Sequence, residues 1–397
     1  MSQGSAGTHE LRWVVRTATE TDVSEIVKLL NHVYGGWGDH NTWLWKYKRN
    51  SKLNTITSAV AEHQGKIIGH YGIIPTRVIY QGEILQCVQA VDAAVSPEFR
   101  RQGIFVSLGS FILENAIGEG AHFAYAFPGL NSLNVNHELG FHPIQYKPEM
   151  VRILQPKKFI IDLLTTFPSN LHAVWQWRYR KDRSPKIIKR LARYRLSMLW
   201  VLSWLSAPVW NRGVSIDGID VKSVETFDSS FDRFSQVCQS NITFGLVKDY
   251  SYLTWRYLER PDRDYHILVA LEGGDMIGYM IMYYAQDKNS ICECEILPGK
   301  EHAVFALLEY AGDVALIAGS RVIDIWIADQ NPIYTALQKS GFISQHHIRQ
   351  WAAKWESLSS MLYQIILYSK HLPAQTQKEL DIDSSYWSLS MGDSDLV

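Results

Sequence analysis

The chain has 397 residues, enough for two to three domains of ordinary size. Hydrophobic residues make up 46% and charged residues 20%, a composition that excludes global disorder. The 39 Lys and Arg against 40 Asp and Glu leave a net charge of -1, which argues against binding of nucleic acid by the whole surface. The four cysteines are too widely spaced for a disulfide framework. Cys292-x-Cys294 lacks the second ligand pair that a zinc site needs, so we expect no metal.

The N-terminus lacks the basic start and apolar run of a secretory signal, so we expect residues 1–12 to be flexible and the protein to be cytoplasmic. The first predicted helix follows, with a capping box made by Asp22 and Glu25. Its apolar residues are spaced for one stripe: Val23, Ile26, Leu30 and Val33.

The rest of a first domain, residues 13–150, reads as a mixed α/β sheet. A hairpin is predicted around Gln64-Gly65, and a long strand is predicted to end at Ser96-Pro97. The expected elements are strands 56–62, 67–73 and 84–95, a helix 104–117 and a buried strand 122–127.

Residues 151–213 differ in composition and read as a helical connector. The stretch 178–195 is rich in Lys and Arg, and it runs into the Trp- and Leu-rich stretch 196–210. That apolar run is shorter than the roughly 20 residues that span a bilayer. Two interpretations stay open: a helix that joins two half-cores, or a segment 178–210 that contacts anionic lipid at the inner membrane face or an acyl carrier protein.

An internal repeat indicates a second domain at 214–356. Trp45-Lys46-Tyr47 recurs as Trp255-Arg256-Tyr257, and each copy precedes a strand, a Gly-containing turn and a second strand. Other positions recur in the same order: Gly69 with Gly278, Asn131 with Asn331, and Gly140-Phe141 with Gly341-Phe342. We expect residues 357–397 to form a C-terminal helix and an acidic tail.

A basic turn joins strand 84–95 to helix 104–117 in the first half only. It reads Arg100-Arg101-Gln102-Gly103-Ile104-Phe105. Unpaired amides and the macrodipole make the start of a helix attractive to anions, and a glycine lets the backbone approach a phosphate. The two arginines add full charges. The sequence predicts an anion cradle here, whereas CEILPGKEHAV at 294–304 lacks the Arg-x-x-Gly pattern.

The cradle resembles the acyl-coenzyme A signature of the GCN5-related N-acetyltransferase (GNAT) superfamily, although Phe105 replaces its last small residue. Asn131 through Gly140-Phe141 resembles the last motif of that superfamily. The resemblance implies an α/β fold of two tandem GNAT-like domains, each a mixed central sheet flanked by helices. It also implies that acetyl-coenzyme A is the co-substrate.

The resemblance further implies that the strands 85–95 and 122–127 splay apart to admit the pantetheine arm. The implied coenzyme-binding residues are the cradle residues with Ala93, Ala94, Val95 and Asn131. Asp92 is the first candidate for a general base and Glu62 the second, and Tyr125 is a candidate general acid because Asn136 replaces the tyrosine that many members use. Covalent catalysis through Cys87 lacks a motif that places a base beside it.

Three functions follow as hypotheses. The first is acetyl transfer from acetyl-coenzyme A to a primary amine, such as an amino sugar or a glycan precursor. The second uses a longer acyl-coenzyme A or an acyl carrier protein as donor. The third is a coenzyme A-binding or membrane-contacting module without turnover. Nucleic acid is not an expected partner, and the sequence does not set the oligomeric state.

Overall fold

The computed structural model describes the core elements of both halves. The described residues are 13–49, 57–128, 130–146, 149–155, 218–240, 242, 244–285, 288–328, 330–344, 364–368, 387–388 and 390–394. The predictions for residues 1–12 and for the basic and apolar stretches 178–210 lie outside these residues. Within them, no helix has the length and apolar content of a membrane span.

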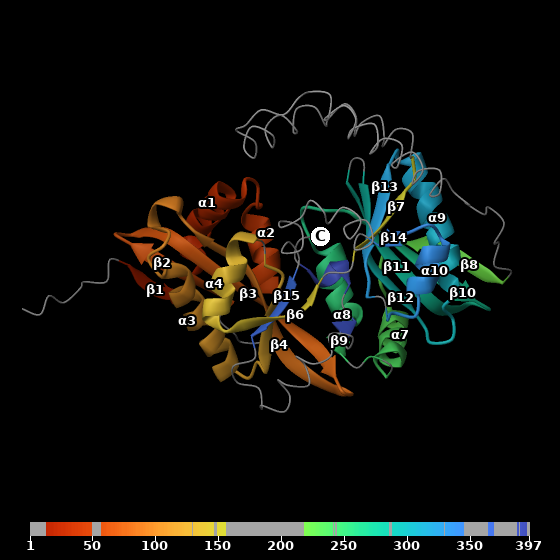
Figure 1. The fold of residues 1–397 in the computed structure, drawn as a ribbon, viewed down its shortest axis with the longest axis horizontal. Helices are drawn as coiled ribbons and strands as arrows, with labels where there is room; N and C mark the ends of the chain where they lie inside the picture. Colours follow the sequence, from red (N-terminus) through yellow and green to blue (C-terminus); the bar gives the residue numbers. More distant parts are fainter. Residues whose placement is uncertain are drawn as a thin grey trace, which may run out of the picture. The chain divides into compact units, whose positions relative to one another are not determined.

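The chain forms two compact units, and each is made of three separate segments of the sequence. The first contains Met1–Lys147, Ile242–Arg263 and Ser357–Ser388, and the second contains Pro148–Asn241, Asp264–Glu356 and Leu389–Val397. Each unit has its own mixed sheet with helices, so the predicted fold class of two α/β domains is confirmed (Figure 1).

The sheet of the first unit has the order β1-β2-β3-β4-β5-β15-β6, with β9 paired to β3 and β16 paired to β9. Its neighbours are antiparallel except for the parallel pairs β4–β5 and β9–β16. The strands are β1 Val14–Thr17, β2 Ser58–His63, β3 Lys66–Tyr80, β4 Glu83–Val95, β5 Phe123–Ala126, β6 Phe141–Tyr146, β9 Phe244–Leu246, β15 Gln364–Tyr368 and β16 Trp387–Ser388.

Helices cover both faces of this sheet. Ile73 packs in the cluster of helix α3 and the adjacent Ile74 packs in the cluster of helix α1, because successive strand residues point to opposite faces. The helices are α1 Val23–Tyr34, α2 His40–Leu44, α3 Ile104–Gly118, α4 Leu130–Leu139 and α8 Tyr250–Leu253, and single π-helical turns follow α2 at η2 Trp45–Arg49 and α8 at η4 Thr254–Leu258.

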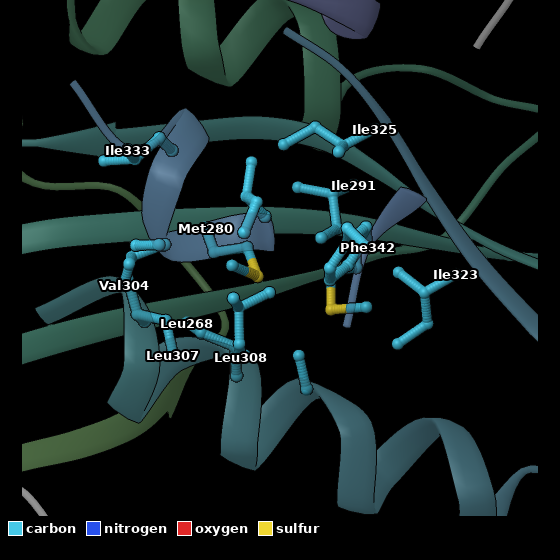
Figure 2. Packing of buried hydrophobic residues seen from close by; sticks show 14 of the residues in the cluster. Leu268, Met280, Ile291, Val304, Leu307, Leu308, Ile323, Ile325, Ile333 and Phe342 are labelled. Carbon is cyan, nitrogen blue, oxygen red and sulfur yellow. The ribbon is translucent and has the colours of Figure 1, made fainter. Parts of the chain in front are cut away.

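The sheet of the second unit has a strand order that corresponds to the path from β1 to β6 in the first. That order is β14-β7-β13-β12-β11-β10-β8. The strands are β7 Glu149–Ile153, β8 Ile219–Val224, β10 Tyr265–Glu272, β11 Asp275–Ala285, β12 Lys288–Ile296, β13 Val322–Trp326 and β14 Ile343–Ser344, and the helices are α7 Ser229–Gln239, α9 Ala303–Ile317 and α10 Tyr334–Lys339. Figure 2 shows its core, where Leu307 and Leu308 of α9 pack with Leu268, Met280 and Ile291 of the sheet.

Each sheet contains strands from the other half of the sequence: β7 in the second unit, and β9, β15 and β16 in the first. Strand β7 follows β6 directly in the chain, yet it pairs with β13 and β14 of the second unit. Strand β15 comes after β14, yet it pairs with β5 and β6 of the first unit. The boundary expected at residue 150 therefore lies inside a strand. The described part of 357–397 also differs from a helix and an exposed acidic tail: it forms β15, β16 and a 3-10 turn that packs against β12, with Asp393 buried.

Of two local predictions, the hairpin turn is confirmed and the capping box is not. Gln64 and Gly65 have φ of 50° and 75°, which makes the predicted hairpin turn between β2 and β3. The predicted capping box is wrong in its partners: Asp22 pairs with Thr19 instead. The carboxylate of Glu25 accepts a hydrogen bond from the Ile67 amide.

Candidate active site

The cradle predicted from Arg100 to Phe105 lies at the start of α3. Gly103 is the N-cap of this 15-residue helix with a left-handed φ of 79°, and Arg101 is also left-handed at 62°. No side chain caps the helix. The first amides of α3 are therefore open to a ligand, and the macrodipole favours an anion there.

The charges of the cradle face solvent. Arg100, Arg101, Gln102 and Gly103 are exposed, and neither arginine forms an ion pair with a described carboxylate. The last two residues of the motif point elsewhere: Ile104 is buried, and Phe105 packs edge-on against Tyr71 with ring centroids 5.5 Å apart. The cradle thus offers two exposed guanidinium groups that form no ion pair with a described carboxylate, and a helix start without a capping side chain.

The corresponding turn of the second unit is already neutralised. The Gly299 amide donates to the Glu301 carboxylate at 2.9 Å, and Lys300 pairs with Glu272. His302, the N-cap of α9, lies 3.8 Å from the same Glu272. Among the described residues, these carboxylates take the place that an anionic ligand could take in the first unit.

An open edge of β4 begins where its pairing with β5 ends. The two strands pair from Cys87 with Phe123 to Ala90 with Ala126, and β5 stops there while β4 runs on to Val95. The Ser96 amide donates to the Ile68 carbonyl at 2.8 Å, beside the register pair of Gly69 with Val95. By antiparallel alternation, the N–H and C=O of Val95 then point away from β3, toward the side where β5 has ended.

Side chains hold two carbonyls of this edge. Tyr34 donates its hydroxyl to the Ala93 carbonyl at 2.7 Å, and Arg100 donates Nε to the Val95 carbonyl at 3.2 Å. The side chains of Ala93 and Val95 pack on the α3 face, and Ala94 is buried on the α1 face. The cradle and the open edge are thus directly linked through Arg100.

Asp92, the first candidate base, is enclosed by donors. Its Oδ2 accepts from Lys46 Nζ at 2.9 Å and from the Tyr47 hydroxyl at 2.5 Å, and its Oδ1 accepts from Trp37 Nε1 at 2.8 Å. Its side chain is 6% exposed. Burial alone would raise the pKa of Asp92, but Lys46 and Tyr47 hold that pKa below its usual value. The group is an ionised carboxylate whose two oxygens are both engaged.

The other candidate catalytic residues have different surroundings. Glu62 on β2 is bound by Arg16 at 2.9 Å. Tyr125 is buried on β5, beside Gln89 of β4 in register, and packs edge-on against Phe127. Asn131 lies in the first turn of α4.

Cys87 is buried and its thiol lies 3.0 Å from the Thr76 hydroxyl. Burial raises the pKa of Cys87 to about 12. A thiol with that pKa is not a thiolate at neutral pH, so the structure gives no support to an acyl-cysteine intermediate.

Sequence reasoning missed the partners of Asp92, namely Trp37, Lys46, Tyr47 and His70. A signal for them exists. The Trp-basic-Tyr motif occurs in both halves of the sequence, and each copy is accompanied by an acidic residue. Asp92 precedes Pro97 by the same number of residues as Glu293 precedes Pro298. Glu293 is fully buried, and the side chain of Asp92 is only 6% exposed.

Comparisons with known proteins agree with this geometry. Residues 14–144 match the family model described as an acetyltransferase (GNAT) domain. A conserved protein of unknown function and probable N-acyltransferase from Enterococcus faecalis has a TM-score of 0.56 at 13% identity, over 90% of this chain and 73% of that chain. GCN5-related N-acetyltransferases from Anabaena variabilis (TM-score 0.57, 10% identity, 90% and 72% coverage) and Kribbella flavida (0.56, 11%, 89% and 70%) are similar in fold. No curated protein matches the chain.

Proposed function

We propose that the protein transfers an acetyl group from acetyl-coenzyme A to a primary amine, because residues 14–144 match the model of an acetyltransferase (GNAT) domain. The observation that carries the proposal is the adjacency of the cradle and the open edge of β4, linked by the hydrogen bond from Arg100 to the Val95 carbonyl. The pyrophosphate of the coenzyme suits the start of α3, with Gly103 allowing close approach. The pantetheine arm would then lie along β4 beyond Ala90.

The chemistry is a direct displacement. The amine nitrogen attacks the thioester carbonyl carbon, the new C–N bond forms, and the C–S bond breaks as coenzyme A leaves as a thiolate that takes up a proton. Since the Val95 N–H points toward the open side, it is the donor that we assign to the developing oxyanion. The attacking amine must lose a proton to a base, and the engaged oxygens of Asp92 argue against that residue as the base.

The test is release of free thiol from acetyl-coenzyme A with a panel of amines that includes amino sugars and polyamines. We expect turnover with at least one amine and loss of at least tenfold in kcat/KM for Arg100→Ala combined with Arg101→Ala. Lys222→Ala, an exposed basic residue of the second unit, is the matched control and should leave turnover unchanged.

Two outcomes would contradict this function. Binding of coenzyme A without thiol release for any amine or acyl chain length would favour a binding module. Equal turnover in the arginine double variant and the wild type would place the coenzyme elsewhere.

A further inference from the structure

We propose that Asp92 is a positioning residue. Together with Trp37, Lys46, Tyr47 and His70, it holds the end of β4 in the conformation that presents the Val95 N–H to acetyl-coenzyme A. We call these five residues the bulge clamp. The role in transfer rests on the proposed function, whereas the effect on the backbone of β4 does not.

The backbone at Asp92 has an unusual conformation that requires support. In the register of β3 with β4, His70 pairs with Ala94 and Gly72 pairs with Val91, so Asp92 and Ala93 together oppose Tyr71 alone. This is a β-bulge, and Asp92 has a φ of 50°, a left-handed value that is uncommon outside glycine. Strained residues of this kind persist only where their surroundings hold them.

The support comes from three separate parts of the first unit. Trp37 belongs to the segment after α1, Lys46 and Tyr47 to the π-helical turn η2, and His70 to β3. The first three donate to the carboxylate of Asp92, and the Lys46 and Asp92 side chains are only 5% and 6% exposed. A buried ion pair with further hydrogen bonds gives a single geometry, because loss of one partner leaves a charge buried alone.

His70 holds the backbone of the same residue. Its Nδ1 lies 2.8 Å from the Asp92 carbonyl, and its Nε2 lies 2.7 Å from the Ser58 hydroxyl. Burial lowers the pKa of His70, so the ring is neutral, with Nδ1–H donating to the carbonyl and Nε2 accepting from the serine. Side chain and carbonyl of Asp92 are therefore both fixed.

Gly72 makes room for this arrangement. A Cβ atom at Gly72 would lie 2.2 Å from the Tyr47 hydroxyl oxygen, so only a glycine lets the phenol reach Asp92. Since Gly72 is the residue paired with Val91 at the edge of the bulge, the strand sequence and the clamp depend on each other.

The consequence lies in the residues that follow. The carbonyls of Asp92, Ala93 and Val95 all accept hydrogen bonds from side chains, those of His70, Tyr34 and Arg100. The acceptors of this stretch are engaged while the Val95 N–H points to the open side. The bulge clamp thus leaves the Val95 N–H as the backbone group available to acetyl-coenzyme A. Asp92 acts through the conformation of the backbone and does not contact the amine.

The direct test removes one hydroxyl. Tyr47→Phe should accelerate amide hydrogen exchange of residues 93–95 at least tenfold, raise the KM for acetyl-coenzyme A at least fivefold, and leave the pH dependence of kcat unchanged. Tyr80→Phe removes a hydroxyl from the far end of β3 and is the matched control, with no effect on exchange at 93–95. If Tyr47→Phe does not fold, Trp37→Phe tests the same point, because it removes only the donor to Oδ1.

The alternative role of Asp92 gives opposite results. If Asp92 is the general base, Asp92→Asn removes the acidic limb of the pH profile of kcat, and Tyr47→Phe leaves exchange at 93–95 unchanged. Either result overturns the proposal. The exchange measurement is made without coenzyme, so it reports on the clamp even if calorimetry shows that the wild type does not bind coenzyme A and the proposed function fails.

Discussion

Gly103 combines a left-handed backbone with an empty side-chain position at the start of α3. A Cβ atom at Gly103 would have no neighbour within 4 Å, so crowding does not require a glycine there. The positive φ favours glycine, and the absence of a side chain leaves room for a ligand. Gly82, in the turn between β3 and β4, has a similar φ of 84° and equally open surroundings. Comparing substitutions at Gly103 and Gly82 therefore distinguishes the effect of backbone strain from the effect on ligand binding.

Gly103→Ala and Gly82→Ala should each lower the free energy of unfolding by about 1 kcal/mol, because both place a side chain at positive φ. Only Gly103→Ala should weaken coenzyme A binding, by tenfold or more, equivalent to about 1.4 kcal/mol. Chemical denaturation and calorimetry measure the two effects. Equal affinities for coenzyme A in the two variants would show that the start of α3 does not contact the ligand.

Cys87 should be chemically silent. Its buried thiol has a pKa raised to about 12, so iodoacetamide at neutral pH should not modify it in the folded protein, as mass spectrometry of digested protein can show. Cys87→Ala should keep kcat within about threefold of the wild type, since cavity effects at one small residue are modest. A stable acyl adduct on Cys87 would restore the covalent route.

Asp92→Asn should change the pH dependence of stability. The folded-state pKa of Asp92 lies below its unfolded value of about 3.9, so its contribution is fully present above that value and is lost as pH falls through the folded pKa. The variant should be less stable than the wild type by about 3 kcal/mol at pH 7, because Lys46 loses its charged partner. That difference should narrow below about pH 4, as urea denaturation between pH 2 and pH 7 can measure. A constant difference across this range would mean that Asp92 is not the ionised partner of Lys46.

At the scale of elements, the two π-helical turns η2 and η4 pack directly against each other through Trp45 and Trp255. Trp45 and Trp255 stack with ring centroids 5.2 Å apart and planes inclined by 15°. Each indole donates to the carbonyl of the other residue, at 2.7 Å and 3.1 Å. Arg260 lies over the Trp45 ring at 5.0 Å. This reciprocal contact places residues 242–263 in the first unit, although the repeat predicts that they belong to the second domain.

Trp255→Phe should lower the free energy of unfolding by about 2–4 kcal/mol, because it leaves the buried Trp45 carbonyl without one donor and reduces the stacking area. Trp13→Phe, at a half-buried position of the first unit, is the control and should cost less than about 1 kcal/mol. Equal losses for the two variants in thermal denaturation would show that the reciprocal bonds add nothing.

Elements with local signals were predictable, and elements that depend on distant partners were not. Positive φ at Gln64-Gly65 and Gly103 is encoded in the residue type, so the hairpin and the start of α3 follow from the sequence. The sequence pattern predicts Glu25 as the capping partner of Asp22, whereas Asp22 pairs with Thr19 and its carboxylate also binds Arg16 of β1, a contact that no local pattern indicates. Strand β15 pairs with β5 and β6, which lie more than 200 residues earlier in the chain, so its own sequence does not reveal its partners.

The candidate site divides in the same way. The cradle is one continuous segment, so the residues from Arg100 to Gly103 are enough to predict it from the sequence. The bulge clamp draws on four segments, so the sequence showed Asp92 as a single acid near the site without its donors. A buried carboxylate with three donors cannot be told from an exposed base until those segments are placed.

At the scale of the whole molecule, both units carry the duplicated fold, and we propose that the coenzyme site lies in the first unit alone. Apart from β9 and β16 of the first unit, the two sheets have corresponding strand orders, and each contains at least one strand from the other half of the sequence. Among the described residues, Arg100 and Arg101 beside the start of α3 form no ion pair with a carboxylate, whereas Glu272 and Glu301 engage the corresponding groups of the second unit. We therefore propose a single coenzyme site per chain.

The most direct measurement is titration of the full chain with coenzyme A by isothermal calorimetry, alongside the Arg100→Ala and Arg101→Ala double variant. We expect one site per chain in the wild type and at least a tenfold weaker affinity in the double variant. No heat of binding in the wild type, two equivalent sites per chain, or undiminished affinity in the double variant would contradict a single coenzyme cradle at the start of α3.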